Sequence, residues 1–378
     1  MNTISESERQ ALYFLIHTGL FSNNTIRKLR KVFGSYEAVY SADENAIAGH
    51  INPKYLNDYI SAKRNTDIVY EYSRLAKKGV HFSLFEDADY PVRFRQLNDS
   101  PVAILYKGFL PSSSIPSVAV IGARNCSNYG RSLAEEYTSY IAEAGIQIIS
   151  GMAMGVDGFA GQAALDCNGK SFAVLGSGPD ICYPSSNRKL YEQLTERGGI
   201  ISEYPLGSPG VGWHFPMRNR LISVLSDVLI VIEAKEKSGT MITVDCALEQ
   251  GRDVFALPGR PCDPVSRGCN LLIRQGAGIL ISPEEFMEDF LSLISGRSEY
   301  AGFLNDQKRK AKQSLLSFAS PEEELIYACL DYSPKSLNEI CSLVNKKAAM
   351  SLSDITVCLC SLSISGAVIN IGGNYARK

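Results

Sequence analysis

An alternation of short apolar runs and helical segments constrains this chain more than any other feature. In the middle of the sequence, the apolar run Val118–Ile121 is followed by Gly122, a polar loop, a helical pattern over about 129–144 and a second apolar run, Ile146–Ile149. Apolar runs of this length, bounded by turn residues, are typical of strands buried on both faces of a parallel sheet. The segment therefore predicts a β-α-β unit. Its loops follow the strands, at the edge where open α/β sheets bind ligands.

The same alternation continues to about residue 282. Further strand-like runs are Phe172–Leu175, Ile200–Ser202, Val228–Ile232 and Val254–Leu257, with Leu271–Gln275 and Ile279–Ile281 completing the series. Helical patterns between them are Asp157–Asp166, Arg188–Glu196, Arg218–Leu225 and Thr240–Gln250. Strands that alternate with helices favour a parallel sheet with helices on both faces. The sequence predicts an α/β protein with an extended Rossmann-like, doubly wound parallel sheet of roughly seven strands.

Changes in pattern divide the chain into four parts. Residues 1–75 have helical spacing and predict a small module of the sterile-alpha-motif or helix-hairpin-helix kind. Residues 76–295 form the Rossmann-like domain, which starts with a connector at 76–116. Residues 296–319 are polar with a basic cluster and predict a solvated linker. Residues 320–378 combine three short helices with a hairpin at a Gly-Gly-Asn turn, which predicts a winged helix.

The sequence does not decide what the two terminal modules bind. The N-terminal module fits an interaction role or a contact with DNA about equally. In the winged helix, Lys346 and Lys347 precede the third helix, which itself carries no Arg or Lys. This composition favours protein contact or scaffolding over sequence-specific reading of DNA, without excluding the latter.

Composition narrows the class of protein. The formal net charge is −2, so any nucleic-acid site must be a local basic patch. The N-terminus lacks the pattern of a signal peptide, and no run of about 18 apolar residues occurs, so we expect a cytoplasmic protein without a membrane span. The ten cysteines form no CxxC pair and the four histidines are scattered. We therefore expect free thiols, no zinc site and no cofactor.

Two nucleotide-binding motifs, the P-loop and the dinucleotide fingerprint, are excluded by the spacing of their residues in this sequence. Gly169-Lys170-Ser171 matches the end of a P-loop, but Ala164 stands where the first glycine belongs and a strand follows instead of a helix. The glycines after the strands never reach GxGxxG, and no acid is placed for a ribose. A P-loop or NAD enzyme is therefore not expected.

The loop Ser238-Gly239-Thr240 follows a strand and opens a helix. In this it resembles the PGGxGTxxE loop of the lysine-decarboxylase-like nucleotide hydrolases. Glu236 and Lys237 stand where that family has glycines, and Thr243 stands where it has the catalytic glutamate. The Gly-Thr pair at a helix N-terminus can still hold a phosphate. The loop therefore indicates binding without hydrolysis.

Basic and aromatic residues accumulate near the ends of the predicted strands. By the doubly wound rule most of them lie at one edge of the sheet, where cations hold phosphates and rings stack bases. Such an arrangement suits a single nucleic-acid strand. The candidate binding residues are Gly122, Arg124, Gly151, Lys170, Phe215, Arg218, Asn219, Arg220, Lys237, Gly239 and Thr240.

Residues 79–291 closely resemble the DNA-processing protein A family, also called DprA or Smf. The resemblance rests on GARNCSNYG at 122–130, SGMAMGVDGFA at 150–160, AVLGSGPDICYPSSNR at 173–188, SEYPLGSP at 202–209, HFPMRNRLISVLSD at 214–227, SGTMITVDCALEQGRDVFALPG at 238–259 and SRGCNLLIRQGA at 266–277. The helical N-terminal module and the winged helix also resemble attachments common in that family.

The resemblance implies a protein that is not an enzyme, binds single-stranded DNA without sequence preference and loads the RecA recombinase during natural transformation and recombination. It also implies a homodimer formed through the α/β domain, with single-strand-binding protein as a further candidate partner. The family's Gly-Ser-Arg loop corresponds to residues 122–124, which implies that Arg124 binds a phosphate. The family's Arg-Asn-Arg segment corresponds to residues 218–220, and its Gly-Thr loop corresponds to residues 239–240. The alternative is a nucleotide-binding enzyme of the lysine-decarboxylase-like class that acts on a nucleoside monophosphate.

Three residues depart from the family's pattern. Ala123 replaces the usual serine, Met154 stands where a Lys or Arg is common, and Gly161 stands where a histidine is frequent. Each phosphate contact that is lost lowers the salt slope of binding by about one. We expect weaker binding at such positions and not its loss.

Overall fold

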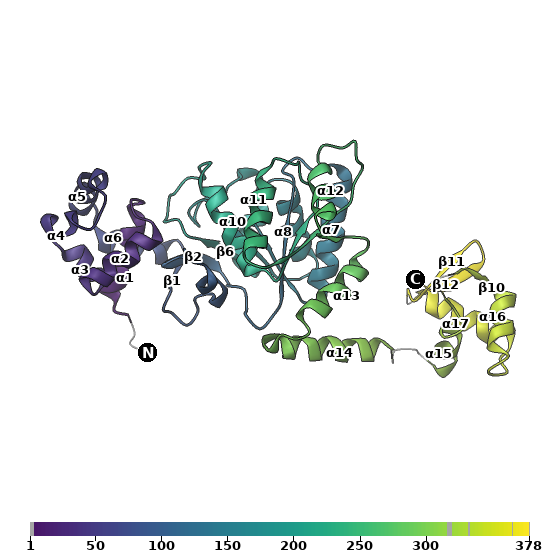
Figure 1. The fold of residues 1–378 in the computed structure, drawn as a ribbon. Coiled ribbons are helices and arrows are strands. Elements are labelled where there is room, and N and C mark those ends of the chain that lie inside the picture. The colour runs from purple at the N-terminus through teal and green to yellow at the C-terminus, as the bar shows by residue number, and fades with distance from the viewer. Residues whose placement is uncertain (1–3, 316–319, 332, 365, 378) are drawn as a thin grey trace. The chain divides into compact units, whose positions relative to one another are not determined.

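The structure is a computed structural model that describes residues 4–315, 320–331, 333–364 and 366–377 (Figure 1). The chain divides into two compact units, Met1–Leu304 and Asn305–Lys378. The segment 296–319, expected as a linker, contains the short helix η4 (Ser298–Tyr300) and the helix α14 (Ala301–Leu315). The rest of that segment, 316–319, lies outside the described residues. No helix in the described ranges is both long and apolar enough to cross a membrane.

The first unit begins with a helical region, as its sequence predicts. Its elements are α1 (Glu6–His17), α2 (Asn23–Phe33), α3 (Tyr36–Ser41), α4 (Glu44–Ala48), η1 (Pro53–Tyr55), α5 (Leu56–Asn65) and α6 (Ile68–Lys77). Short polar side chains at the N-caps, such as Ser22 and Asp43, accept hydrogen bonds from first-turn N–H groups and fix where these helices begin. Phe14, Leu29 and Tyr59 are buried in the core that the helices share.

A nine-stranded sheet follows. Its strands are β1 (His81–Leu84), β2 (Ala103–Gly108), β3 (Ser117–Ile121), β4 (Gln147–Ser150), β5 (Ser171–Leu175), β6 (Gly199–Ser202), β7 (Val228–Val231), β8 (Asp253–Ala256) and β9 (Gly278–Ile279). Their order is β1-β2-β6-β5-β4-β3-β7-β8-β9. The strands from β6 to β9 are parallel, which confirms the predicted doubly wound sheet. The strand expected at Leu271–Gln275 is wrong, because this segment is the end of the helix α12 (Arg267–Arg274), which buries Leu272 against the sheet. The connector supplies β1 and β2, which extend the sheet antiparallel at β6.

Helices cover both faces of the sheet (Figure 1). They are α7 (Asn128–Glu143), α8 (Val156–Asp166), α9 (Arg188–Arg197), α10 (His214–Leu225), α11 (Gly239–Glu249), α12 (Arg267–Arg274) and α13 (Pro283–Ile294), with the short helices η2 (Val92–Gln96) and η3 (Ser185–Asn187). Because strand side chains alternate between faces, Ala119 packs in the core under η2, α10, α11 and α12, and Val118 packs in the core under α7, α8 and α13. Each face therefore has its own apolar core.

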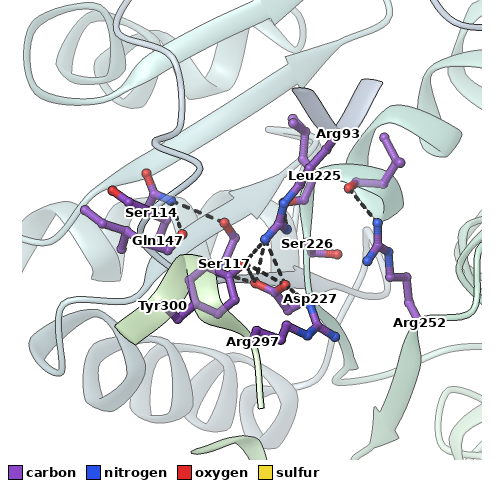
Figure 2. A network of polar contacts seen from close by, with 12 residues as sticks. Arg93, Ser114, Ser117, Gln147, Leu225, Ser226, Asp227, Arg252, Arg297 and Tyr300 are labelled. Carbon is purple, nitrogen blue, oxygen red and sulfur yellow. Dashed lines mark hydrogen bonds and ion pairs between the residues drawn. The ribbon is translucent and has the colours of Figure 1, made fainter. Parts of the chain in front are cut away.

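A buried carboxylate fixes the start of β7 (Figure 2). Asp227 is fully buried and accepts hydrogen bonds from Arg93 at 2.8 Å, Arg297 at 2.5 Å, the Tyr300 hydroxyl at 2.8 Å and the Ser117 backbone N–H at 2.8 Å. Arg93 belongs to η2, whereas Arg297 and Tyr300 follow α13. The network therefore holds two segments that are distant in sequence against the amino ends of β3 and β7.

The second unit contains α15 (Pro321–Tyr327), β10 (Lys335–Ser336), α16 (Leu337–Val344), α17 (Leu352–Ile364), β11 (Val368–Ile371) and β12 (Asn374–Arg377). The antiparallel strands lie in the order β10-β12-β11, and this sequence of elements is that of a winged helix. Ile340 and Leu359 are buried in its core. On the exposed side of α17, Val357 is 67% and Ile364 is 89% exposed.

Candidate functional site

A cavity of about 640 Å³ opens at the carboxyl ends of the parallel strands. Chain connections leave β3 toward β4 and leave β7 toward β8, so the crevice between β3 and β7 is the switch point of the doubly wound sheet, where ligands bind in such folds. The cavity is lined by Ile121, Gly122, Ala123, Arg124, Asn125, Ala153, Asp157, Tyr183, Gly210, Gly212, Phe215, Pro216, Arg218, Asn219, Ile222, Lys235, Ser238, Gly239, Thr240, Ile242, Thr243 and Val265.

Glycines allow the loops after β3 and β4 to touch. Gly155 has φ +75°, and a Cβ there would lie 2.3 Å from the Ala123 carbonyl oxygen. A Cβ at Gly122 would lie 2.7 Å from a methyl group of Val156. The Val156 N–H in turn donates to the Ala123 carbonyl at 3.3 Å. The backbone of 122–124 is thus held against the start of α8, and a side chain at either glycine would separate the two loops.

Three helices begin at the cavity without a side-chain cap. Within the described part of the chain, the N-cap residues Gly155 of α8, Trp213 of α10 and Ser238 of α11 accept no hydrogen bond from the first turn through a side chain. By contrast, the Ser127 hydroxyl caps α7 by accepting from the Gly130 N–H at 3.1 Å. First-turn N–H groups and the positive ends of the helix dipoles favour anions. The cavity is therefore suited to phosphate groups.

Arg124 and Phe215 form the exposed part of the wall. The Arg124 guanidinium is exposed, makes no ion pair with any described residue and lies 5.5 Å from the centroid of the Phe215 ring. The ring packs beside Tyr183, with centroids 5.4 Å apart, and Gly176 leaves room for it because a Cβ there would lie 2.8 Å from the ring. A free cation beside fixed aromatic rings can hold a phosphate while the rings stack a base.

Arg218 lines the same cavity but is only 5% exposed. Its guanidinium donates to the carbonyls of Gly151, at 3.0 Å, and Val174. Burial lowers its pKa to about 10, so it is still charged at neutral pH. Gly151 also donates its N–H to Asp157 at 3.1 Å, and a Cβ on this glycine would lie 2.7 Å from both charged groups. Gly151 thus lies beneath the cavity, between a buried cation and its counter-charge.

Asn219 and Thr240 connect the loops of the cavity. The Asn219 amide donates to the Gly239 carbonyl at 3.4 Å, and the Thr240 hydroxyl donates to the Gly122 carbonyl at 3.1 Å. The loops after β3 and β7 are therefore joined through the starts of α10 and α11. Of the residues predicted from sequence, the structure brings together Gly122, Arg124, Phe215, Arg218, Asn219, Gly239 and Thr240 around the cavity, with Gly151 below them.

Arg220 lies outside the cavity although it follows Asn219 by one residue. It is 12% exposed and pairs with both oxygens of Glu203 at 2.8 Å and with Asp99 at 2.9 Å. The Asn23 amide also donates to Glu203, at 3.1 Å. Arg220 therefore neutralises a carboxylate pair that joins the helical region and the connector to β6.

The two predicted lysines are also not part of the lining. Lys170 is exposed at the amino end of β5, the edge opposite the cavity, and donates to the Arg197 carbonyl at 3.1 Å. Lys237 is exposed in the loop before α11, next to Glu236, which pairs with Arg267 at 2.7 Å.

The positions where the chain departs from the family pattern differ in their surroundings. Met154 is 47% exposed in the loop before α8. Gly161 is buried on α8, and a Cβ there would contact Leu190 of α9 at 3.3 Å, so this position packs two helices together and does not line the cavity. Among the described residues, no group of three His, Cys, Asp or Glu side chains could hold a metal ion.

Sequence reasoning missed Asp157 as the buried counter-charge of Arg218 and Tyr183 as the ring beside Phe215. Asp157 stands in the first turn of α8, where an acid is common, so its spacing carries no information about its partner. Tyr183 stands in the motif at 173–188, which carries no local sign of a contact with Phe215.

Comparison with known proteins identifies the family of this chain. A family model described as DNA recombination-mediator protein A matches residues 81–291. DNA processing protein DprA of Streptococcus pneumoniae is 34% identical over 279 residues, which cover 74% of this chain and 97% of that protein. Protein Smf of Escherichia coli is 35% identical over 292 residues, which cover 76% of this chain and 75% of that protein.

Solved structures resemble the chain as well. The X-ray structure of DprA from Streptococcus pneumoniae superposes with a TM-score of 0.64 at 33% identity, over 74% of this chain and 97% of that one. DNA processing protein A of Helicobacter pylori, whose structure was described for its single-stranded DNA binding mode, superposes with a TM-score of 0.52 at 29% identity, over 57% of this chain and 98% of that one. The chain therefore belongs to the DNA recombination-mediator protein A family, known as DprA or Smf.

Proposed function

We propose that this protein binds single-stranded DNA, without sequence preference, in the cavity between β3 and β7. The observation that carries the proposal is the Arg124 guanidinium, which has no ion-pair partner among the described residues and lies beside the Phe215 ring. The single-stranded DNA binding described for the Helicobacter pylori relative supports the same ligand.

The cavity offers separate contacts to the two parts of a nucleotide. Arg124 and the uncapped starts of α8 and α11 suit the backbone phosphates, since cations and helix N-termini both attract anions. The exposed ring of Tyr183 and the partly buried ring of Phe215 suit the bases, because every base presents a face for stacking. Arg218 keeps its hydrogen bonds to two backbone carbonyls and has Asp157 beside it as a counter-charge, so it supports the wall of the cavity and adds no net charge to it.

The site lacks a carboxylate where the lysine-decarboxylase-like hydrolases have their catalytic glutamate. Thr243 occupies that position and is 3% exposed. Asp157 also lines the cavity, and burial raises its pKa, although Arg218 lies beside it and the Gly151 N–H donates to it. These contacts hold its carboxyl group in the wall, away from the position of the hydrolases' glutamate. A binding function without catalysis is therefore the better account of these residues.

Loading of RecA and assembly into a homodimer are further parts of the proposal. Membership of the recombination-mediator family supports the first. For the second, β9 is an edge strand of the sheet; Ile279 in this strand is 45% exposed, and Ile281 just after it is 65% exposed. Paired apolar edges of this kind suit a contact between two copies through the α/β domain. Single-strand-binding protein stays a candidate partner, and the exposed apolar side of α17 suits a protein contact.

The proposal is tested with fluorescence anisotropy, using labelled oligothymidylate, a labelled duplex and, separately, incubation with nucleoside monophosphates. We expect binding to the single strand that weakens with salt, weaker binding to the duplex and no release of base from the mononucleotides. Release of base together with no binding to single strands would refute the proposal and favour the hydrolase alternative.

A further inference from the structure

A second cavity, of about 710 Å³, lies next to the first one. It is formed where the start of α7 faces the loop between β8 and α12, and its lining includes Asn128, Tyr129, Arg260 and Asp263. None of these residues belongs to the candidate site predicted from sequence. The second cavity therefore needs its own explanation.

A thin wall separates the two cavities. Asn125 lines the first cavity and Ser127 the second, while Val265 lines the first and Ser266 the second. In each of these two segments, residues close in sequence thus line different cavities. The Cα atoms of residues two apart in a chain are at most about 7 Å apart. A strand that leaves the first cavity over this wall reaches the second within a short step.

The Tyr129 ring is presented for stacking. Its side chain is 50% exposed, and its hydroxyl donates to the Pro258 carbonyl at 3.1 Å, which fixes the ring against the opposite wall. An aromatic face that is both exposed and fixed can stack a base of any identity.

Among the charged side chains that line the second cavity around the Tyr129 ring, one is a cation that can attract a phosphate. Glu233 is 2% exposed, and its two oxygens accept from the Ser127 N–H at 2.8 Å and hydroxyl at 2.6 Å. The Asp263 carboxylate also lines the cavity and repels a phosphate on its side. The Arg260 guanidinium is exposed and has no ion pair with a residue that the structure describes. A phosphate in this cavity therefore lies at Arg260.

We propose that the second cavity is an extension of the DNA path, in which Tyr129 stacks one base of the strand and Arg260 contacts the adjoining phosphate. This inference rests on the proposed function, because it needs a strand that is already held in the first cavity. A free mononucleotide offers the same chemistry of base and phosphate and is the competing source of the ligand.

The test compares Tyr129→Ala with Tyr129→Phe in the full-length protein, using oligothymidylates of increasing length. Phenylalanine removes only the hydrogen bond to Pro258 and keeps the ring, so it is the matched control. Loss of one stacking contact, about 1–3 kcal/mol, predicts an affinity of Tyr129→Ala for long oligonucleotides that is about 5- to 140-fold weaker. Tyr129→Phe should bind within about twofold of the wild type, and short oligonucleotides that fill only the first cavity should bind all three proteins equally. Arg260→Ala should reduce the salt slope for long oligonucleotides only.

Each other outcome has a defined meaning. If the wild type binds long strands and Tyr129→Ala binds them equally well, the second subsite is refuted while the proposed function stands. If the wild type binds no single strand, both fail. Equilibrium binding of labelled thymidine monophosphate that depends on Tyr129 and does not compete with long oligonucleotides would assign the cavity to a free nucleotide and overturn the inference. Equal midpoints of thermal unfolding for the wild type and the two Tyr129 variants would show that the substitutions leave the fold unchanged.

Discussion

Replacement of Asp227 by alanine should destabilise the first unit strongly. The side chain is fully buried and neutralises Arg93 and Arg297, whose side chains are 15% and 33% exposed (Figure 2). It also accepts from the Tyr300 hydroxyl and a backbone N–H. Removal of one partner from a buried ion pair costs about 3–5 kcal/mol, since the remaining charges lose their compensation. We expect a loss of this size in the free energy of unfolding.

The assay is urea denaturation, because urea carries no charge and does not screen ion pairs. Unfolding is followed by far-ultraviolet circular dichroism, because Trp213, the one tryptophan of the chain, is 67% exposed and its emission would change little. The matched control is Glu135→Ala, which removes an exposed pair with Arg131 at 2.9 Å and should cost less than about 1 kcal/mol. Trypsin should also cleave after Arg297 faster in Asp227→Ala. Equal unfolding midpoints for the two variants would refute the role assigned to the network.

Three further predictions concern the loops, the thiols and the basic residues. Gly155→Ala forces a side chain into a backbone with φ +75° and should cost about 1–3 kcal/mol in unfolding free energy, with weaker binding of oligothymidylate. Burial raises the pKa of Cys269 to about 12, so this thiol should stay unreactive toward a disulfide reagent from pH 7 to pH 9, whereas the exposed Cys262 is accessible to the reagent. Arg220→Ala leaves Glu203 without its partner and should cost about 3–5 kcal/mol in urea denaturation, while the salt slope of DNA binding stays unchanged.

The architecture of the sheet could be predicted because its central parallel strands are short apolar runs with both faces buried, as in Val118–Ile121. The connector contributes β1 and β2, and the antiparallel pairing of β2 with β6 could not be predicted. That pairing depends on a contact between Lys107 and Ile200, residues separated by a whole series of helices, and no local pattern records it.

The sequence predicts which loops form the candidate site better than it predicts which charged side chains face the cavity. The rule that ligands bind at the carboxyl ends of strands placed Gly122, Arg124 and Gly239 at the cavity. Lys170 precedes its strand, so the same rule places this lysine at the amino ends of the strands, opposite the cavity. Arg218 and Arg220 are alike in sequence, yet their acidic neighbours come from remote segments. Free and paired cations therefore cannot be separated without the fold.

The most direct test of the central claim is the salt dependence of single-strand binding in Arg124→Ala, with Lys170→Ala as the control of equal charge. One phosphate contact on a single strand contributes about 0.7 to the slope of log affinity against log salt concentration. We expect Arg124→Ala to bind more weakly and to lose about that much of the slope, while Lys170→Ala keeps the wild-type affinity and slope. An unchanged slope in Arg124→Ala, or an equal loss in both variants, would contradict a strand bound in the cavity between β3 and β7.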